Sequence, residues 1–187
     1  MNKTTRALTE SQYKEIIQTI QQGFHGQRPN DRCATILMLQ ANLGLRIGDL
    51  LELRLCDIVR DGDRYRLDIV EEKTGKRRRF TVPVILQQFI ENYCYRNKIG
   101  RQERIFPITA RNVQLVLKRT CEWLGYEGIG THSFRKYYAT EIYKNNDYNI
   151  ALVQHLLQHS SASTTQRYIG IEPREVEAAI LNHMKLL

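Results

Sequence analysis

The chain has 187 residues, which suits one ordinary domain with a real hydrophobic core, and its formal net charge of +8 favours a polyanionic partner. No apolar run reaches membrane-spanning length and no signal-peptide pattern opens the chain, so we expect a cytoplasmic protein with no membrane partner. The cysteines are scattered and lack the close pairing of zinc ligands, so we expect no metal site. Reduced, mostly buried thiols are expected at Cys33, Cys56, Cys94 and Cys121.

The first part of the chain is predicted to be helical. Thr9 precedes a capped helix over Glu10–Gln21, whose apolar residues recur on one face. Glycines, a proline and polar residues predict a loop over Gly23–Asn30. A buried helix is expected over Asp31–Gln40, and a shorter one over Ile47–Leu53.

A small antiparallel sheet is expected next. Apolar and polar residues alternate over Tyr65–Val70, as in a half-buried strand, and Lys73–Gly75 turns the chain into a second strand over Arg78–Val82. Helices are then predicted over Val84–Tyr95, Arg111–Trp123, Ser133–Lys144, Ile150–Leu157 and Glu172–Met184. No linker divides the chain, so residues 1–187 are expected to form a single, mainly α domain with a small antiparallel sheet (α+β).

Residue types that can attack a phosphodiester are concentrated between positions 132 and 168. His132 and Arg135 lie one helical turn apart, and His159 and Tyr168 follow. Arginine offers a rigid fork that matches phosphate oxygens, and histidine exchanges a proton near neutral pH. Tyrosine becomes a covalent nucleophile when its proton is removed and its anion is stabilised. Each residue alone has a commoner structural explanation, so the inference depends on the set.

Basic residues upstream extend this set. Arg46 lies at a turn into a helix, where Asp49, three residues on, could hold its guanidinium at a phosphate site; an isolated pair of this spacing is more often a surface ion pair. Lys73 lies at the hairpin tip, and Lys76, on the same turn, is its rival for a chemical role. Basic residues that could follow a DNA backbone are Lys76, Arg77, Arg78 and Arg79.

Together these pieces resemble the catalytic domain of the tyrosine recombinases, the phage integrase family. The matching stretches are Gly44–Leu53, Lys73–Gly75, His132–Arg135 and Leu156–Tyr168, in the order that the family has them. The resemblance implies a DNA breaking-rejoining enzyme fold. It also implies a site-specific recombinase or integrase in which Tyr168 attacks a DNA phosphate and forms a 3′-phosphotyrosyl bond.

The resemblance implies a role for each of the other residues. Arg46, Arg135 and His159 hold the non-bridging phosphate oxygens. Lys73 protonates the leaving 5′-oxygen, and His132 takes the tyrosine proton. No metal or nucleotide cofactor is implied, because the phosphotyrosyl link keeps the bond energy for religation.

The resemblance also sets expectations for domains and partners. Most members carry an N-terminal helical domain that clamps the DNA, and we expect this chain to lack it, as a naturally short recombinase or as a fragment. A tail helix over about 172–187 would pack on a neighbouring protomer or on its own domain. The implied partners are double-stranded DNA, further protomers in a synaptic tetramer, and accessory DNA-bending proteins.

Three alternatives remain. A type IB topoisomerase-like enzyme shares the chemistry but relaxes supercoils without sequence preference, and a hairpin telomere resolvase shares it in a usually much larger protein. A catalytically silent DNA-binding regulator is the third. The complete residue set argues against the regulator, because a pure binder has no need for Tyr168 together with His159.

Overall fold

The computed structural model describes residues 5–159 and 162–169. The chain divides into two compact units, Met1–Tyr138 and Ala139–Leu187, and the expected single domain stays a prediction. The tail helix predicted over about 172–187 lies outside the described residues. Within the described part of the chain, no helix is both long and apolar enough to cross a membrane.

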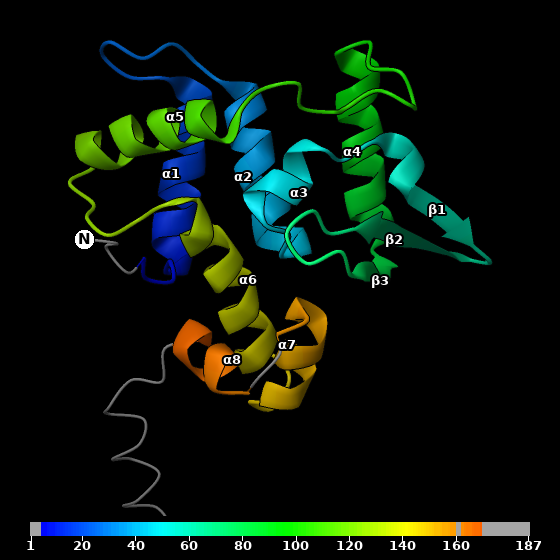
Figure 1. Ribbon diagram of the computed structural model, residues 1–187. Coiled ribbons are helices and arrows are strands. Elements are labelled where there is room, and N and C mark those ends of the chain that lie inside the picture. Colours follow the sequence, from blue (N-terminus) through cyan, green and yellow to red (C-terminus); the bar gives the residue numbers. More distant parts are fainter. Residues whose placement is uncertain (1–4, 160–161, 170–187) are drawn as a thin grey trace, which may run out of the picture. The chain divides into compact units, whose positions relative to one another are not determined.

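Both units are built mainly from helices (Figure 1). The first unit contains, in chain order, α1 (Glu10–Gln22), α2 (Asp31–Leu43), α3 (Ile47–Leu51), the 3₁₀ helix η1 (Leu55–Asp57), β1 (Ile58–Asp61), β2 (Arg64–Val70), β3 (Arg77–Val82), α4 (Val84–Arg96), α5 (Ala110–Trp123) and the start of α6 (Thr131–Lys144). The second unit contains the rest of α6, then α7 (Ile150–Leu157) and α8 (Ala162–Ile169). A mostly helical fold with a small antiparallel sheet confirms the predicted fold class.

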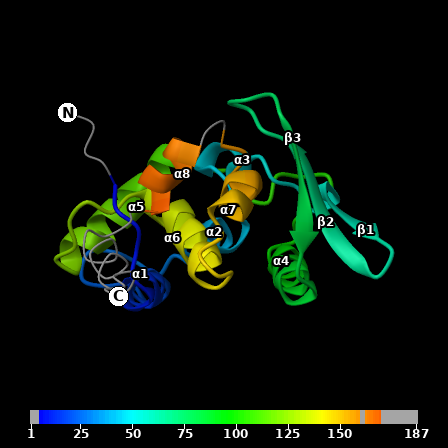
Figure 2. The same ribbon diagram turned by 90° about the horizontal axis from the view of Figure 1, so that it is seen from below.

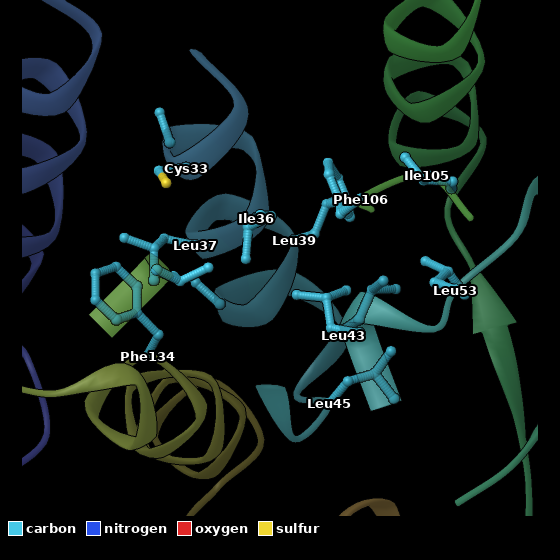
Figure 3. Close-up of a cluster of buried hydrophobic side chains, with 14 of the residues drawn as sticks. Cys33, Ile36, Leu37, Leu39, Leu43, Leu45, Leu53, Ile105, Phe106 and Phe134 are labelled. Carbon is cyan, nitrogen blue, oxygen red and sulfur yellow. The ribbon is translucent and has the colours of Figure 1, made fainter. Parts of the chain in front are cut away.

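Helix α2 lies at the centre of the first unit's core. It is buried along most of its length, as expected of a helix that is apolar on nearly every side, and α1 packs against both α2 and α5. Figure 3 shows buried side chains of α2 together with those that pack around them from other elements. The α2 residues are Ile36, Leu37, Leu39 and Leu43, and the others are Leu45, Leu53, Ile105, Phe106 and Phe134. This packing fixes the C-terminal end of α2, where the site begins.

Local sequence signals set most helix boundaries. Thr9 and Gln12 form the reciprocal capping box that starts α1, and the Asn30 side chain accepts a hydrogen bond from the Cys33 N–H at the start of α2. The predicted ends of the next two helices are wrong by a few residues. Helix α2 continues past Gln40 to Leu43, because the core covers that turn, and α3 is shorter than predicted.

The sheet is an antiparallel meander in the order β1-β2-β3 (Figure 2). Its register sets Leu67 opposite Phe80 and Tyr65 opposite Val82, so these apolar side chains share one face, and α4 packs on β2. The sequence pattern did not predict β1. The β2–β3 hairpin with its turn at Lys73 is confirmed, and it carries that turn toward α3, since the Glu72 N–H donates to Asp49.

In the second unit, α7 has the bounds predicted from the sequence. The Asn149 side chain caps it by accepting from the Leu152 N–H at 3.0 Å. It ends at Leu157, and the left-handed backbone of the following Gln158 (φ 53°) turns the chain toward α8. Helix α8, which carries Tyr168, was not predicted, and it packs against α7.

Candidate active site

Arg46 occupies the connection between α2 and α3, in extended backbone (φ −68°, ψ 152°). Its side chain is 21% exposed and hydrogen-bonds the carboxylate of Glu71, whereas the nearest Asp49 oxygen lies 3.9 Å away. Asp49 instead accepts the Glu72 backbone N–H at 2.9 Å. Asp49 is therefore close to the Arg46 guanidinium, as expected, but the hydrogen bond that holds this guanidinium is accepted by Glu71.

The carboxyl of Glu71 is fully buried, and burial by itself raises its pKa. The hydrogen bond and charge of Arg46, together with the Thr74 hydroxyl and the charge of Arg78, outweigh burial and lower the pKa below its ordinary value. Glu71 is therefore an anion at neutral pH, and it holds the Arg46 guanidinium where α3 begins.

Arg135 and His132 lie in the first turns of α6, three residues apart and so on one side of the helix. Arg135 is 1% exposed, and its Nη1 donates to the Gly44 carbonyl oxygen at 2.6 Å. His132 is exposed. The largest cause of its lowered pKa is the loss of solvent around the imidazole, and positive charges lower the pKa further. These charges belong to Arg135, Lys136, Arg46 and Lys73.

Lys73 is exposed on the turn that joins β2 to β3. The Gly75 N–H donates to the Glu71 carbonyl at 2.8 Å, and the Thr74 hydroxyl donates to the Glu71 carboxylate at 3.0 Å. The Thr74 contact ties the turn to the same buried carboxylate that holds Arg46. Lys73 is close enough to His132 for its charge to affect that imidazole.

The basic run after the turn divides by strand alternation. Arg77 and Arg79 point to the outward face, where both donate to Asp68, at 2.6 Å and 3.0 Å; the Arg77 hydrogen bond is the chief cause that lowers the pKa of Asp68 to about 2. Arg78 points inward and is 1% exposed. The prediction that Arg78 contacts a DNA backbone is therefore wrong, because successive side chains of a strand face opposite sides. Lys76 remains exposed on the turn.

The second unit carries the remaining predicted residues. His159 follows α7 directly, and its Nδ1 lies 3.1 Å from the hydroxyl of Thr165, a buried residue of α8. Tyr168 lies on α8 one turn after Thr165, and its side chain is outside the described residues. His159 is thus joined to the helix that carries Tyr168.

Two supporting residues were missed by the sequence reasoning, namely Glu71 and Arg78. The sequence did contain a signal for both residues, in the two-residue alternation of inward and outward side chains along a strand. Glu71 continues the inward positions of β2, in step with Leu67 and Ile69, and Arg78 is in step with Phe80. A charge in phase with buried apolar residues indicates a paired interior group.

Residues 6–175 match the model of the phage integrase family. The chain belongs to this family of tyrosine recombinases.

Relatives of this family member include the probable integrase/recombinase YoeC of Bacillus subtilis, 32% identical over 157 residues, which cover 80% of this chain and 83% of YoeC. Tyrosine recombinase XerC of Caldanaerobacter subterraneus is 25% identical over 92% of this chain and 49% of its own. Tyrosine recombinase XerA of Pyrococcus furiosus is 27% identical over 94% of this chain and 60% of its own. The chain therefore spans about half of this XerC and about three fifths of this XerA.

Solved structures of the family share its fold. The XerA recombinase superposes with a TM-score of 0.70 at 17% identity, over 100% of this chain and 66% of XerA. The catalytic domain of bacteriophage HP1 integrase gives a TM-score of 0.67 at 18% identity, over 96% of this chain and 95% of that domain. A lambda integrase dimer bound to a COC′ core site gives 0.69 at 22% identity, over 94% and 62%. The expected recombinase catalytic-domain fold is confirmed.

Proposed function

We propose that this chain cleaves and rejoins DNA at specific sites through a 3′-phosphotyrosyl link to Tyr168. The observation that carries the proposal is a set of fixed contacts. Glu71 holds both Arg46 and the turn that bears Lys73. The Gly44 carbonyl oxygen holds Arg135, which lies one helical turn after His132. Metal-independent phosphodiester cleavage needs cationic donors around the phosphate and a neutral base beside them. Membership of the phage integrase family supports the same conclusion.

In this proposal Arg46 and Arg135 bind the non-bridging oxygens of the scissile phosphate, together with His159. Each arginine is anchored through its Nη1, by Glu71 for Arg46 and by the Gly44 carbonyl for Arg135. A guanidinium has several N–H donors in a rigid fork, so an anchored arginine can still present others to phosphate oxygens. Donors that are fixed in advance stabilise the charge of the transition state without reorganising.

His132 and Lys73 handle the protons. The lowered pKa of His132 keeps its imidazole neutral at pH 7, so that it can accept the phenolic proton as the Tyr168 oxygen attacks phosphorus. The bond from phosphorus to the 5′-oxygen breaks, and Lys73 gives that oxygen its proton. Religation reverses each step.

Exposed basic residues of the hairpin are proposed to bind the DNA backbone. Lys76, Arg77 and Arg79 are exposed, and the chain carries a net charge of +8. Both arginines are paired with Asp68, so a DNA phosphate competes with that carboxylate for them. Their contribution to DNA binding should therefore depend strongly on salt.

The working complex is proposed to be a synaptic tetramer on double-stranded DNA in the bacterial cytoplasm, with accessory DNA-bending proteins. Structures of relatives support binding by several protomers: one is a lambda integrase dimer on a core site, and another is XerH on a palindromic difH substrate. A palindromic site matches a two-fold arrangement of protomers. Residues 1–187 are proposed to act as one catalytic domain.

The test uses nicked duplexes from the DNA that flanks the coding locus, in which the cleaved fragment diffuses away. The protein should become linked to DNA in a form that resists SDS and is released by protease, also when a chelator is present. Supercoiled plasmid without such a site should not be relaxed. Relaxation of any plasmid without site preference would favour the topoisomerase-like alternative, and binding with no adduct on any duplex would favour the silent regulator.

A further inference from the structure

A buried ion pair lies beneath the proposed site. Glu71 is fully buried and Arg78 is 1% exposed, and an oxygen of the Glu71 carboxylate lies 3.2 Å from Arg78 Nη1. The Arg78 guanidinium also stacks over the Phe80 ring, 4.9 Å from its centroid. Removing two charges from water costs about as much as their attraction returns, so such a pair is weak evidence for stability alone. Its other contacts indicate what it does.

On one side, the Glu71 carboxylate serves two groups of the proposed site. One oxygen accepts from Arg46 and from the hydroxyl of Thr74, the neighbour of Lys73, while the other faces Arg78. One carboxylate therefore fixes the direction of the Arg46 guanidinium and the shape of the Lys73 turn at once.

On the other side, Arg78 reaches the end of α2. It donates to the carbonyl oxygens of Leu43 and Gly44, each at 3.2 Å. The Gly44 oxygen also accepts from Arg135 at 2.6 Å. Gly44 has a left-handed backbone (φ 59°), and a Cβ there would lie 2.3 Å from the Tyr138 ring, so only glycine brings this carbonyl to both guanidinium groups.

We infer that Glu71 and Arg78 are positioning residues that align Arg46, Arg135 and the Lys73 turn as one rigid set. The contacts form a continuous path from Arg46 through Glu71, Arg78 and the Gly44 carbonyl to Arg135. Small displacements of groups that act on a transition state cost large factors in rate, which gives this buried support a function. The inference rests on the proposed function, because it concerns the same arginines.

The experiment measures single-turnover cleavage of the nicked duplex by the full chain, with DNA affinity and thermal unfolding measured beside it. Glu71→Gln keeps the shape but removes the charge that directs Arg46. Cleavage should slow about 10²-fold, with little change in DNA affinity. The matched control is Glu72→Gln, which removes the same charge from the adjacent exposed position and should cleave like the wild type.

A double-mutant cycle separates positioning from general damage to the fold. If Glu71 acts through Arg46, the loss caused by Glu71→Gln should shrink to a few-fold in the Arg46→Ala background. An equal loss in both backgrounds, or no loss in the wild type, would overturn the inference. Wild-type cleavage by Arg46→Ala would instead contradict the proposed function.

A second variant covers the case in which Glu71→Gln does not fold. Glu71→Asp keeps a charge beside Arg78 but withdraws the carboxylate by one methylene, so it cannot reach both arginines. It should fold, bind DNA and cleave slowly, whereas a folded Glu71→Asp that cleaves at the wild-type rate would overturn the inference.

Discussion

Replacing Arg78 with methionine separates a buried structural arginine from a DNA-contacting one. The change removes one partner of a buried ion pair and takes a donor from the carbonyl oxygens of Leu43 and Gly44. Breaking such a pair costs about 3–5 kcal/mol, and we expect about 3 kcal/mol because Glu71 keeps its contact with Arg46. Each kcal/mol lowers Tm by about 2–4 °C in a chain of this size, so Tm should fall by about 6–12 °C.

The assay pairs thermal unfolding, followed by circular dichroism, with DNA binding measured over a range of salt concentrations. The control is Arg77→Met. Arg77 is the neighbour of Arg78 in β3, but it is exposed and pairs with Asp68 on the outward face of the sheet. It should unfold near the wild-type temperature and flatten the salt dependence of DNA binding by about one unit of slope. If Arg78→Met unfolds like the wild type and flattens the salt slope instead, our account of this strand is wrong.

Three further predictions concern the proposed site. The cleavage rate should be flat near neutral pH and fall as the pH drops through the lowered pKa of His132, and a rate that rises on acidification would exclude His132 as the base. The folded state should also lose stability as the pH falls from the ordinary pKa of histidine to that lower value, because the unfolded chain binds the proton first. Lys73→Ala should cleave normal DNA slowly but recover most of its rate on a duplex with sulfur at the bridging 5′ position, because a thiolate needs little protonation to leave. Rescue of Lys76→Ala instead would assign the role of general acid to Lys76. Arg135→Lys keeps the charge but loses the fork, so cleavage should fall about 10²–10³-fold, and a near wild-type rate would show that a point charge suffices at this position.

Much of the fold could be predicted from local patterns. The capping residue before α1, the alternation in β2 and the turn at Lys73 are short-range signals, and each led to the correct element. Asp31 was expected to cap α2, whereas the Asn30 side chain does so and Asp31 is the first residue of the helix. Helix α8 was missed because it is short and most of its residues are polar, and its place is fixed by packing on α7. Short edge strand β1 was missed for a similar reason, since pairing with β2 defines it.

The candidate site was predictable in its residue types but not in its supports. Arg46, Lys73, His132 and Arg135 were proposed from order and spacing, and the first unit brings their charges together. The contact of Arg46 with Glu71 joins positions 25 residues apart, which no helical or strand spacing encodes. The prediction that Arg77, Arg78 and Arg79 are all exposed was wrong for Arg78, because alternate side chains of a strand face opposite sides and Arg78 faces the core.

The most direct test of the central claim is to identify the residue that becomes attached to DNA. The wild-type adduct formed on a nicked duplex is digested with trypsin, and the peptide that carries the nucleotide is sequenced by mass spectrometry. The account predicts a phosphodiester on Tyr168, and it predicts that Tyr168→Phe binds the same duplex without forming any adduct. A modified peptide that maps to another tyrosine, or an adduct that persists in Tyr168→Phe, would contradict it.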